Sequence, residues 1–569
     1  MSRRSIGRQC LGYFSSLIQL VTLLFHKWRL ADTDSSLGTT MSETIEPMVS
    51  IEKPELFFGL VGAVGTDLAL VRELLTDQLA RVGYKTELVK VTDLLFAFDD
   101  SGELLQRTSG NEFDRIDTLM HAGNEVRRST ERRDIMAMLA ISEIRDRRGK
   151  LNKALGVAEE ESEKRAVPGT AYIIHSLKTP QEIQTLRDTY GRGLTIISAY
   201  SPQSARADAL ANRLCESAKE SSPDDFQSNA WHLIQRDEKE GDAFGQNLRN
   251  TFPKADLFID ASCRQSVTND IERFVEILFE FPFHSPSIDE YGMSFADIAA
   301  LRSLDLARQV GAAIVTSGGS VTAVGCNEVP ARGGGQYWPQ DPDDKRDFQV
   351  GYDSSDRNKR DVVSEVVERL GRAELLSDND SENFDELVEK LVDGDQPVLS
   401  GSKLLSVLEY GRSVHAEMAA LSDAARRGIS VEGATMYCTT FPCHLCARHI
   451  IASGIKRLVY VEPYPKSLAK GMYKDSMVVD PDSDTDTRVR FESFSGVAPR
   501  YYGFAFKSNI DRKVEKSNGT AKAGDVVKWN PAESSPRLRR FVTSYVFIEE
   551  DVMDAYLSRS LKKVKLNLQ

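Results

Sequence analysis

The sequence SVHAEMAAL, residues 413–421, and the sequence FPCHLC, residues 441–446, decide how the second half of this chain is organised. Each begins a stretch with the apolar spacing of a helix, and these stretches stop at Gly428 and near Gly454. Glycine just after an amphipathic stretch is a common helix end. The sequence therefore predicts two helices, with His415 at the beginning of the first and a pair of cysteines at the beginning of the second.

One imidazole and two thiols, from His415, Cys443 and Cys446, form a set of metal ligands that suits zinc. A structural zinc ion normally has four protein ligands, whereas a catalytic zinc ion has three and keeps one position open. Both helix N-termini should point toward the metal and stabilise the thiolates. We therefore expect a bound Zn²⁺ ion with a catalytic function.

Glu417 lies two residues after the expected ligand His415. This spacing places a carboxylate beside the metal without making it a ligand. Zinc lowers the pKa of a bound water molecule toward about 7, and a nearby base can then take the released proton. We interpret Glu417 as the catalytic residue that moves protons between water and substrate. For the cysteine pair alone, a structural or redox role is the main alternative.

The order of these residues, H-x-E followed by P-C-x-x-C, resembles the signature of the zinc-dependent cytidine and deoxycytidylate deaminases. The resemblance extends to RSLDLARQVGAAIV at residues 302–315, GCNEVP at residues 325–330 and GVAPRY at residues 496–501. It implies a three-layer αβα domain that converts the cytosine of dCMP or dCTP to uracil and releases ammonia. In that family the asparagine that matches Asn327 contacts the sugar of the nucleotide.

Tyr464 and Lys466 are further candidates for substrate binding. They follow the apolar run LVYV at residues 458–461, which predicts a strand after the second helix. The end of this strand should lie near the mouth of the active site, where a tyrosine and a lysine can meet a base or a phosphate. A strand edge followed by a turn explains the same two residues equally well.

The first half of the chain alternates short apolar runs with amphipathic stretches, a pattern typical of parallel strands joined by helices. The runs are LFFGLV at residues 56–61, AYII at 171–174, LTIISA at 194–199 and DLFID at 256–260. The segment FPFHSPS at residues 281–287 contains two prolines and marks the expected domain boundary. We therefore predict an α/β protein with a parallel-sheet domain over residues 54–285 and a zinc-dependent deaminase domain over residues 290–557.

A glycine-rich turn between the first strand and its helix is a candidate nucleotide site, because backbone N–H groups at such a turn can bind phosphate. Its candidate binding residues are Gly59, Gly62, Gly65 and Thr66. An active phosphate loop has Gly, Lys and Ser or Thr where this chain has Asp67, Leu68 and Ala69. The turn thus resembles P-loop nucleotide kinases in architecture only, and phosphoryl transfer is not expected. Regulatory nucleotide binding or a structural role is left open.

The combination of a degenerate P-loop kinase-like domain with a deoxycytidylate deaminase domain resembles the bacterial anti-phage deoxycytidylate deaminases. That resemblance implies depletion of the deoxycytidine nucleotide pool during infection, restraint by a small antitoxin RNA, and a homo-oligomer. The basic segments at residues 121–128 and 145–150 could contact phosphate or RNA. Helices that carry solvated charges are the ordinary alternative for both segments.

Several further segments are predicted from weaker sequence patterns. A helix is expected over residues 294–308, followed by a strand at 311–316 and a strand that ends at Cys326. Residues 331–413 form a long insertion with helices near 362–376 and 383–391, which suggests a lid, an oligomer contact or a regulatory element. In the first half, the polar residues 217–246 indicate a mobile lid, an insertion or a solvated helical excursion.

Composition excludes several classes of protein. The chain has 569 residues, a formal charge of -13, 41% apolar residues and 28% charged residues, so globular domains are expected. The acidic balance argues against a protein that mainly coats nucleic acid. Seven scattered cysteines are too few for a secreted disulfide framework, which favours the cytoplasm. No apolar run reaches the length of a membrane span.

The two ends of the chain differ from the rest. Residues 1–50 form an extension whose first part is basic and contains an apolar run at residues 11–25. This pattern resembles a signal peptide, but polar residues interrupt the run and no cleavage site follows. A disordered extension, or a true start at Met41, explains it better. Residues 558–569 form a short basic tail.

Two rival functions fit part of the evidence. A tRNA adenosine deaminase shares the style of residues 415–421, but it should be small and basic rather than large and acidic. An RNA-binding or nucleotide-sensing module with an inert deaminase domain is the second rival. The intact Glu417 argues against an inert domain.

Overall fold

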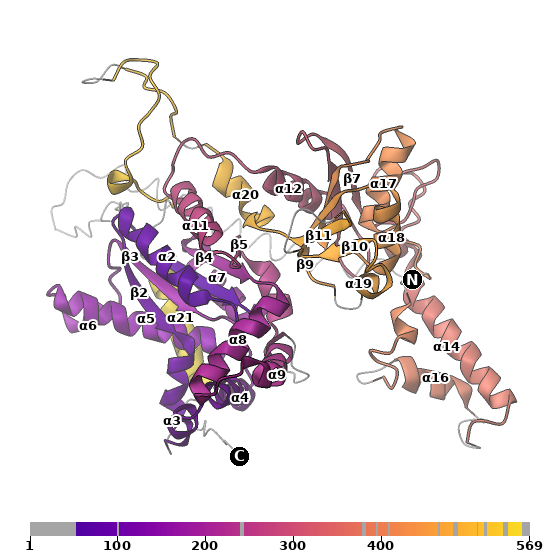
Figure 1. The fold of residues 1–569 in the computed structure, drawn as a ribbon, viewed down its shortest axis with the longest axis horizontal. Helices are drawn as coiled ribbons and strands as arrows, with labels where there is room; N and C mark the ends of the chain where they lie inside the picture. The colour runs from indigo at the N-terminus through magenta and orange to yellow at the C-terminus, as the bar shows by residue number, and fades with distance from the viewer. Residues whose placement is uncertain are drawn as a thin grey trace, which may run out of the picture. The chain divides into compact units, whose positions relative to one another are not determined.

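The computed structural model describes residues 53–99, 102–238, 244–377, 383–393, 397–407, 410–464, 467–481, 487–508, 510–516, 521–538 and 544–559. The chain divides into two compact units, Met1–Val49 and Ser50–Gln569, and every described residue belongs to the second. The expected extension at residues 1–50 and residues 560–569 of the expected tail lie outside the described residues. The predicted α/β class is confirmed, because the second unit contains two six-stranded sheets with helices (Figure 1).

The first sheet has the strand order β12-β5-β4-β1-β3-β2, in which β12 is the short strand Gly496–Val497. Its parallel strands are β1 Leu56–Gly62, β2 Lys85–Lys90, β3 Thr170–His175, β4 Leu194–Tyr200 and β5 Leu257–Asp260. The four apolar runs each form a strand as predicted. Strand β2 was not predicted, because its sequence KTELVK is mostly polar and contains no apolar run. An edge strand tolerates such residues, since one of its sides faces solvent.

Helices cover both faces of the first sheet, which explains why every residue of β1 is buried. On one face, α2 Leu68–Arg81 and α11 Arg264–Leu278 share a core with Phe58. On the other face, α5 Ile135–Ala154 and α7 Pro180–Tyr190 share a core with Phe57. The alternation of the two phenylalanines follows from the two-residue repeat of a strand.

Three further helices form a satellite cluster beside the first sheet. They are α4 Glu112–Thr130, α8 Gln203–Ala218 and α9 Gln227–Glu238. The short helix α3, Glu103–Thr108, precedes α4 and packs against it. Helix α9 lies within the polar stretch 217–246. It buries Leu233 and Ile234 against α8, so this part of the stretch is a packed helix rather than a lid.

The second sheet has the strand order β10-β11-β9-β8-β6-β7. Its strands are β6 Gly311–Val315, β7 Val321–Cys326, β8 Thr435–Thr440, β9 Arg457–Glu462, β10 Met477–Val479 and β11 Val489–Ser493. Helix α12 Ile288–Ala300 packs on one face. Helices α17 Ala416–Arg426 and α18 His444–Ala452 pack on the other, which gives three layers.

The helix predicted over residues 294–308 is wrong at both ends. Helix α12 begins earlier, at a capping box formed by Ser287 and Glu290, and it ends at Ala300. Gly311 lies so close to α12 that an added Cβ would stand 1.8 Å from the carbonyl oxygen of Ala296. The chain must leave the helix to reach this contact, so residues 301–310 form a loop.

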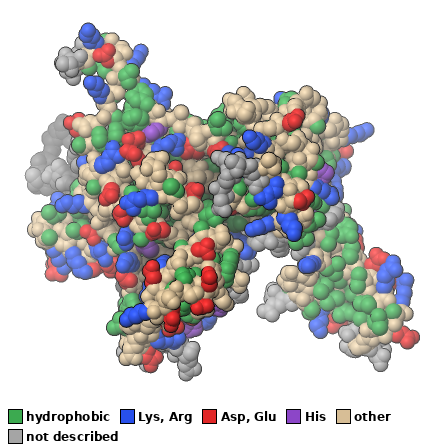
Figure 2. Space-filling model, viewed as in Figure 1, with side chains coloured by type: hydrophobic (Ala, Val, Ile, Leu, Met, Phe, Trp, Pro, Cys, Tyr) green, Lys and Arg blue, Asp and Glu red, His purple; other side chains and the backbone are tan. Residues whose placement is uncertain are grey.

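The insertion at residues 331–413 forms its own helical lobe. It contains α13 Asp347–Val350, α14 Ser354–Arg372 and α16 Phe384–Val392, with a small shared core. Helix α14 begins earlier than predicted because Asp353 caps its N-terminus. Hydrophobic side chains gather over α14 and α16 in Figure 2, and the exposed ones are Val366, Leu370, Leu375 and Val398.

The chain after the second sheet returns to the first sheet. Strand β12, Gly496–Val497, pairs antiparallel with β5. Helix α20, Pro499–Phe506, packs against α11 and α12, and helix α21, Ser544–Arg559, packs against α5 and α7. The last part of the segment expected as the second domain, residues 290–557, therefore shares its core with the first sheet. In the described part of the chain, no helix is long and apolar enough to cross a membrane.

Candidate metal centre and active site

The predicted metal ligands come together at the beginnings of two helices. His415 is the N-cap residue of α17 and Cys443 is the N-cap residue of α18. The backbone N–H of Cys446 donates a hydrogen bond to the sulfur of Cys443 at 3.4 Å. Nδ1 of His415 lies 3.3 Å from the sulfur of each cysteine. Among the described residues, this is the only group of three or more such side chains close enough to share one metal ion.

The three ligand side chains share protons through their mutual hydrogen bonds. Hydrogen bonding from Cys446, followed by that with His415, lowers the pKa of Cys443 to about 4. The hydrogen bond with Cys443 raises the pKa of His415 to about 9. Hydrogen bonding to Cys443 and burial raise the pKa of Cys446. The cluster thus holds protons that a divalent cation would displace, and its donor set fits zinc.

Glu417 lies in the first turn of α17, beside the ligand cluster. Its side chain is almost completely buried, and burial raises the pKa of its carboxyl group. It is not part of the ligand group itself. A raised pKa favours the protonated form of a carboxyl group, which helps it to hold and then donate a proton, as general acid–base catalysis requires.

A cavity of about 290 Å³ opens onto this cluster. It is lined by His415, Glu417 and Cys443, and also by Asn327 and Tyr464. Its volume lies just below the range for small-molecule sites, which is about 300–1,000 Å³. Among the described residues, the structure therefore brings most sequence-predicted residues of the second half to one place.

Asn327 holds the wall of the cavity. Its Oδ1 accepts a hydrogen bond from the backbone N–H of Val310 at 2.7 Å, and its Nδ2 donates one to the carbonyl oxygen of Arg308 at 2.7 Å. These bonds shape the loop that follows α12. The contact between Asn327 and a sugar stays a prediction.

Tyr464 and Arg308 form a pair at the cavity. The guanidinium carbon of Arg308 lies 5.0 Å from the centre of the Tyr464 ring, within the range of a cation–π contact. Arg308 is exposed and forms no ion pair with a described residue. The other residue predicted from this strand, Lys466, lies outside the described residues.

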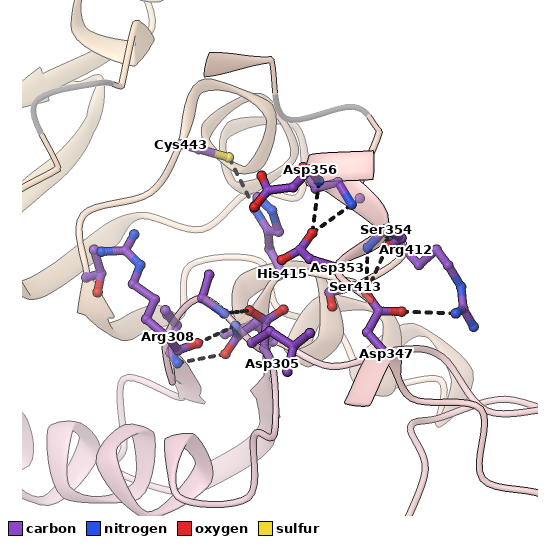
Figure 3. A pocket seen from close by; sticks show the side chains of 18 of the residues that line it. Asp305, Arg308, Asp347, Asp353, Ser354, Asp356, Arg412, Ser413, His415 and Cys443 are labelled. Atoms are coloured by element: carbon purple, nitrogen blue, oxygen red, sulfur yellow. Dashed lines mark hydrogen bonds and ion pairs between the residues drawn. The ribbon is translucent and has the colours of Figure 1, made fainter. Parts of the chain in front are cut away.

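The insertion supplies cavity residues that the sequence did not reveal. Asp347 and Asp353 from its helical lobe line the same cavity, together with Arg412 just before the histidine (Figure 3). Lys359 of α14 lines it as well. Asp353 accepts hydrogen bonds from backbone N–H groups of α14, and Arg412 pairs with Asp347 at 2.9 Å. The only sequence signal for this arrangement is that the insertion ends directly before His415.

The glycine-rich turn of the first half is explained by close packing. An added Cβ at Gly59 or Gly62 would collide with leucine or isoleucine side chains, and one at Gly65 would lie 2.6 Å from the carbonyl oxygen of Arg206. Gly65 also has a φ of +90°, which favours glycine. These contacts support a structural role for the glycines. Nucleotide binding by Gly59, Gly62, Gly65 and Thr66 stays a prediction.

An internal carboxylate already occupies a backbone donor of this turn. The N–H of Val64 donates to Oδ2 of the buried Asp237 at 2.5 Å. Lys178 donates to Oδ1 of Asp237 at 2.7 Å and to the carbonyl oxygen of Gly62 at 3.1 Å. A carboxylate of the protein thus fills one position at which a phosphate would be expected.

The basic segments of the first half are largely paired within the protein. Arg127 is buried and pairs with Glu182 at 2.9 Å. Arg148 is completely buried and pairs with Glu55 and Glu549. These pairs use charges that the sequence left available for RNA or phosphate, and they favour the alternative in which both segments are ordinary helices.

Comparison with known proteins identifies the segment that contains the metal centre. Residues 286–462 match the family model described as "Cytidine and deoxycytidylate deaminase zinc-binding region". The deoxycytidylate deaminase of Enterobacteria phage T4 is 57% identical over 54 residues, 10% of this chain and 28% of the phage protein. The deoxycytidylate deaminase of Saccharomyces cerevisiae is 26% identical over 206 residues, 35% of this chain and 47% of the yeast protein.

A solved dCMP deaminase is among the structural neighbours of this chain. The dCMP deaminase of cyanophage S-TIM5 in complex with dCMP and dUMP is 17% identical and covers 37% of this chain and 100% of the phage chain, with a TM-score of 0.21. The family model alone covers the zinc-binding region, and the chain spans less than half of the length of the phage T4 and yeast relatives.

Proposed function

We propose that this chain, whose residues 286–462 form a cytidine and deoxycytidylate deaminase zinc-binding region, deaminates deoxycytidine nucleotides by hydrolysis. The substrates are dCMP, dCTP or both, and the products are the corresponding uracil nucleotides and ammonia. One observation carries the proposal: His415, Cys443 and Cys446 form a three-ligand cluster with the buried Glu417 beside it in one cavity.

The chemistry follows from the side chains of the cavity. When bound by the three ligands, zinc supplies an activated water molecule and an open coordination position. Glu417 accepts a proton of that water and donates it to N3 of the cytosine ring as the oxygen adds to C4. Glu417 then carries the second proton to the amino group, which leaves as ammonia when the C4–N bond breaks. The burial of Glu417 keeps bulk water away from these proton transfers.

The rim of the cavity favours a free nucleotide over a nucleic acid strand. Arg308 has no carboxylate partner among the described residues, so it is available to bind the phosphate of one nucleotide. Asp347 and Asp356 also line the cavity, but they pair with Arg412 and Lys359, so Arg308 is the one positive charge of the described lining that is left for a phosphate group. This distribution of charge supports deamination of a nucleotide rather than of tRNA.

The experiment that tests the proposal uses purified protein and separate substrates. We expect dCMP or dCTP to yield a uracil nucleotide and ammonia, both measured by chromatography and a coupled assay. A chelator should abolish the reaction, and added Zn²⁺ should restore it. Inosine formation in a tRNA stem-loop, without any reaction of dCMP or dCTP, would replace this proposal with the rival one.

On the sequence resemblance alone, we extend the proposal to a role in defence against phage. The enzyme would act in the cytoplasm as a homo-oligomer, exhaust the deoxycytidine nucleotides of an infected cell, and be restrained by a small RNA until infection. The six described cysteines are all free, in keeping with a reducing compartment. Infected cells that carry the wild-type chain should lose dCTP and resist phage. Cells that carry Glu417→Gln should do neither, and protection by this variant would support the sensing module instead.

A further inference from the structure

A second cavity, of about 400 Å³, lies where residues of both sheets meet. Tyr200 and Ser201 reach it from the carboxyl end of β4, and Ala63 and Thr66 reach it from the segment after β1. Tyr460 reaches it from β9 of the other sheet. The carboxyl ends of parallel strands are the usual place for ligands in sheets of this kind.

Thr66 gives a first indication that the cavity receives a ligand. Its side chain is 8% exposed, and its Oγ1 has no hydrogen-bond partner among the described residues. Buried hydroxyl groups almost always have a partner, because an unpaired one loses its hydrogen bonds to water. Thr66 lines the cavity, where a polar ligand atom would be its partner.

Two positive charges at the cavity lack internal partners. Arg249 is half-buried and Lys470 is exposed, and neither forms an ion pair or hydrogen bond with a described residue. The nearby Arg206 differs, since it donates to Glu238 at 3.1 Å and to the carbonyl oxygen of Ser201 at 3.2 Å. Arg249 and Lys470 are therefore the groups available to an anion.

Aromatic side chains line the same cavity. Phe441 and Tyr460 meet edge to face with ring centres 5.0 Å apart, and Tyr200, Phe252 and Tyr464 also line the cavity. Aromatic faces and edges of this kind bind planar rings. A phosphate and a planar ring in one small molecule are the features of a nucleotide.

We infer that the second cavity binds a phosphorylated nucleotide, with the phosphate near Arg249 and Lys470 and the base against the aromatic side chains. The cavity volume suits a ligand of this size. The site lies beside the glycine-rich turn rather than on its N–H groups, one of which donates to Asp237.

Occupancy of this cavity should affect the metal cavity, because Phe441 and Tyr464 line both. The ring of Tyr464 forms a cation–π contact with Arg308. Phe441 lies two residues before the ligand Cys443. A nucleotide that moves either ring would change the site of the proposed reaction. This coupling rests on the proposed function, whereas binding to the second cavity does not.

Calorimetry on the full, zinc-loaded chain tests the binding. The titrants are GMP and dTMP, which cannot undergo cytosine deamination, with inorganic phosphate as the control for a simple anion site. We expect at least one nucleotide to bind at least 10-fold more tightly than phosphate. Arg249→Ala and Lys470→Ala should each weaken this binding about 10-fold, which is the loss of one charge-assisted hydrogen bond.

Lys85→Ala is the matched control, since Lys85 is an exposed lysine in the edge strand β2. It should bind the nucleotide like the wild-type chain. Nucleotide binding no tighter than that of phosphate would overturn the inference, and so would unchanged binding by both Arg249→Ala and Lys470→Ala. Thermal unfolding of each variant checks that the fold is retained.

Location and coupling need a second measurement. A photoreactive 8-azido-GMP should label peptides that contain residues 246–254 or 467–474, whereas labelling confined to residues 305–310 or 353–359 would overturn the site. Bound nucleotide should change kcat or KM for dCMP about fivefold in the wild-type chain and not in Arg249→Ala, and unchanged kinetics would overturn the coupling. If the nucleotide binds but dCMP does not react, the proposed function fails and the second site stands.

Discussion

A single substitution at Glu417 can test proton transfer without removing a metal ligand. Glu417→Gln keeps the size of the side chain and leaves the three ligands in place. We expect zinc content, measured by elemental analysis, to be unchanged and turnover of dCMP to fall about 10²–10⁴-fold. Cys446→Ala is the contrasting variant, since it should lose both zinc and turnover. Full activity in Glu417→Gln would show that another group moves the protons.

His175 should make the stability of the first sheet depend on pH. Burial, together with the charges of Arg72, Lys178 and Lys90, lowers its pKa to about 4, whereas an unfolded histidine has a pKa of about 6.5. Protonation therefore favours the unfolded chain. The stabilising contribution is complete above about pH 6.5 and is lost as the pH falls toward 4.

Urea unfolding of the wild-type chain and of His175→Gln isolates this effect. Between pH 7.5 and pH 5, the wild-type free energy of unfolding should fall by about 2 kcal/mol more than that of the variant. Other titrating groups, such as Asp270 with its pKa raised by burial to about 6, contribute equally to both proteins and cancel in the difference. Parallel curves would show that His175 does not titrate in this window.

At the scale of elements, the C-terminal helix α21 is held by a completely buried charge. Arg148 of α5 donates to Glu549 of α21 at 2.6 Å and to Glu55 at 3.1 Å. Removal of one member of a buried ion pair costs about 3–5 kcal/mol, because it leaves a buried charge without a partner. Arg148→Ala should lower the free energy of unfolding by this amount in urea titrations.

The neighbouring residue supplies a matched control for this prediction. Arg147 pairs with Glu143 and Glu87, but all three side chains are partly exposed. Partly exposed ion pairs contribute about 1 kcal/mol or less. Arg147→Ala should therefore have little effect. Similar losses in the two variants would indicate that burial of the charge is not what holds α21.

Helix α17, which contains Glu417, packs closely against strand β7 at Gly325. A Cβ added at Gly325 would lie 2.5 Å from the carbonyl oxygen of Ala416 and 2.5 Å from the N atom of Ala420. Gly325→Ala should move the helix away from the sheet, destabilise the fold by about 1–3 kcal/mol and lower zinc occupancy. Thermal unfolding and elemental analysis measure the two effects.

Gly318→Ala is the control in the same hairpin. Its added Cβ would meet only Thr316 Oγ1, at 3.8 Å, and its φ is not in the left-handed region. This variant should keep zinc and stability. Normal zinc content in Gly325→Ala would show that close packing of α17 at Gly325 is not needed for metal binding.

At the scale of the whole molecule, the two sheets should unfold together. Val497 and Tyr501 lie in the core of the first sheet with Phe274, although they follow the second sheet in sequence. Tyr200 of β4 also donates a hydrogen bond to Asp480, which follows β10. A fragment limited to residues 53–285 lacks these partners and exposes the apolar surface that they cover.

We expect this fragment to aggregate or to lose its near-ultraviolet circular dichroism, while the full chain unfolds in one calorimetric transition. Co-expression with residues 494–559 should restore part of its solubility. A soluble fragment with a cooperative transition at the same temperature as the full chain would show that the first sheet is an independent domain.

Local patterns were sufficient for the metal cluster and for most of the strands. The ligands and Glu417 lie within two short motifs, each at the beginning of a helix. The position of a helix N-terminus depends mainly on residues that are near in sequence. The apolar runs form strands because burial on both faces selects them. Strand β2 has no such run and was not found.

Four features depended on packing between distant segments: the loop at residues 301–310, the insertion residues in the metal cavity, the second cavity, and the return of α21 to Arg148. Their partners are separated by many residues, and no local pattern records which partner a side chain will meet. By itself, then, the sequence determined which residues form the metal cluster and the α/β class of the fold. The tertiary structure alone decided what surrounds that centre, because burial and charge pairing are settled only when distant elements pack together.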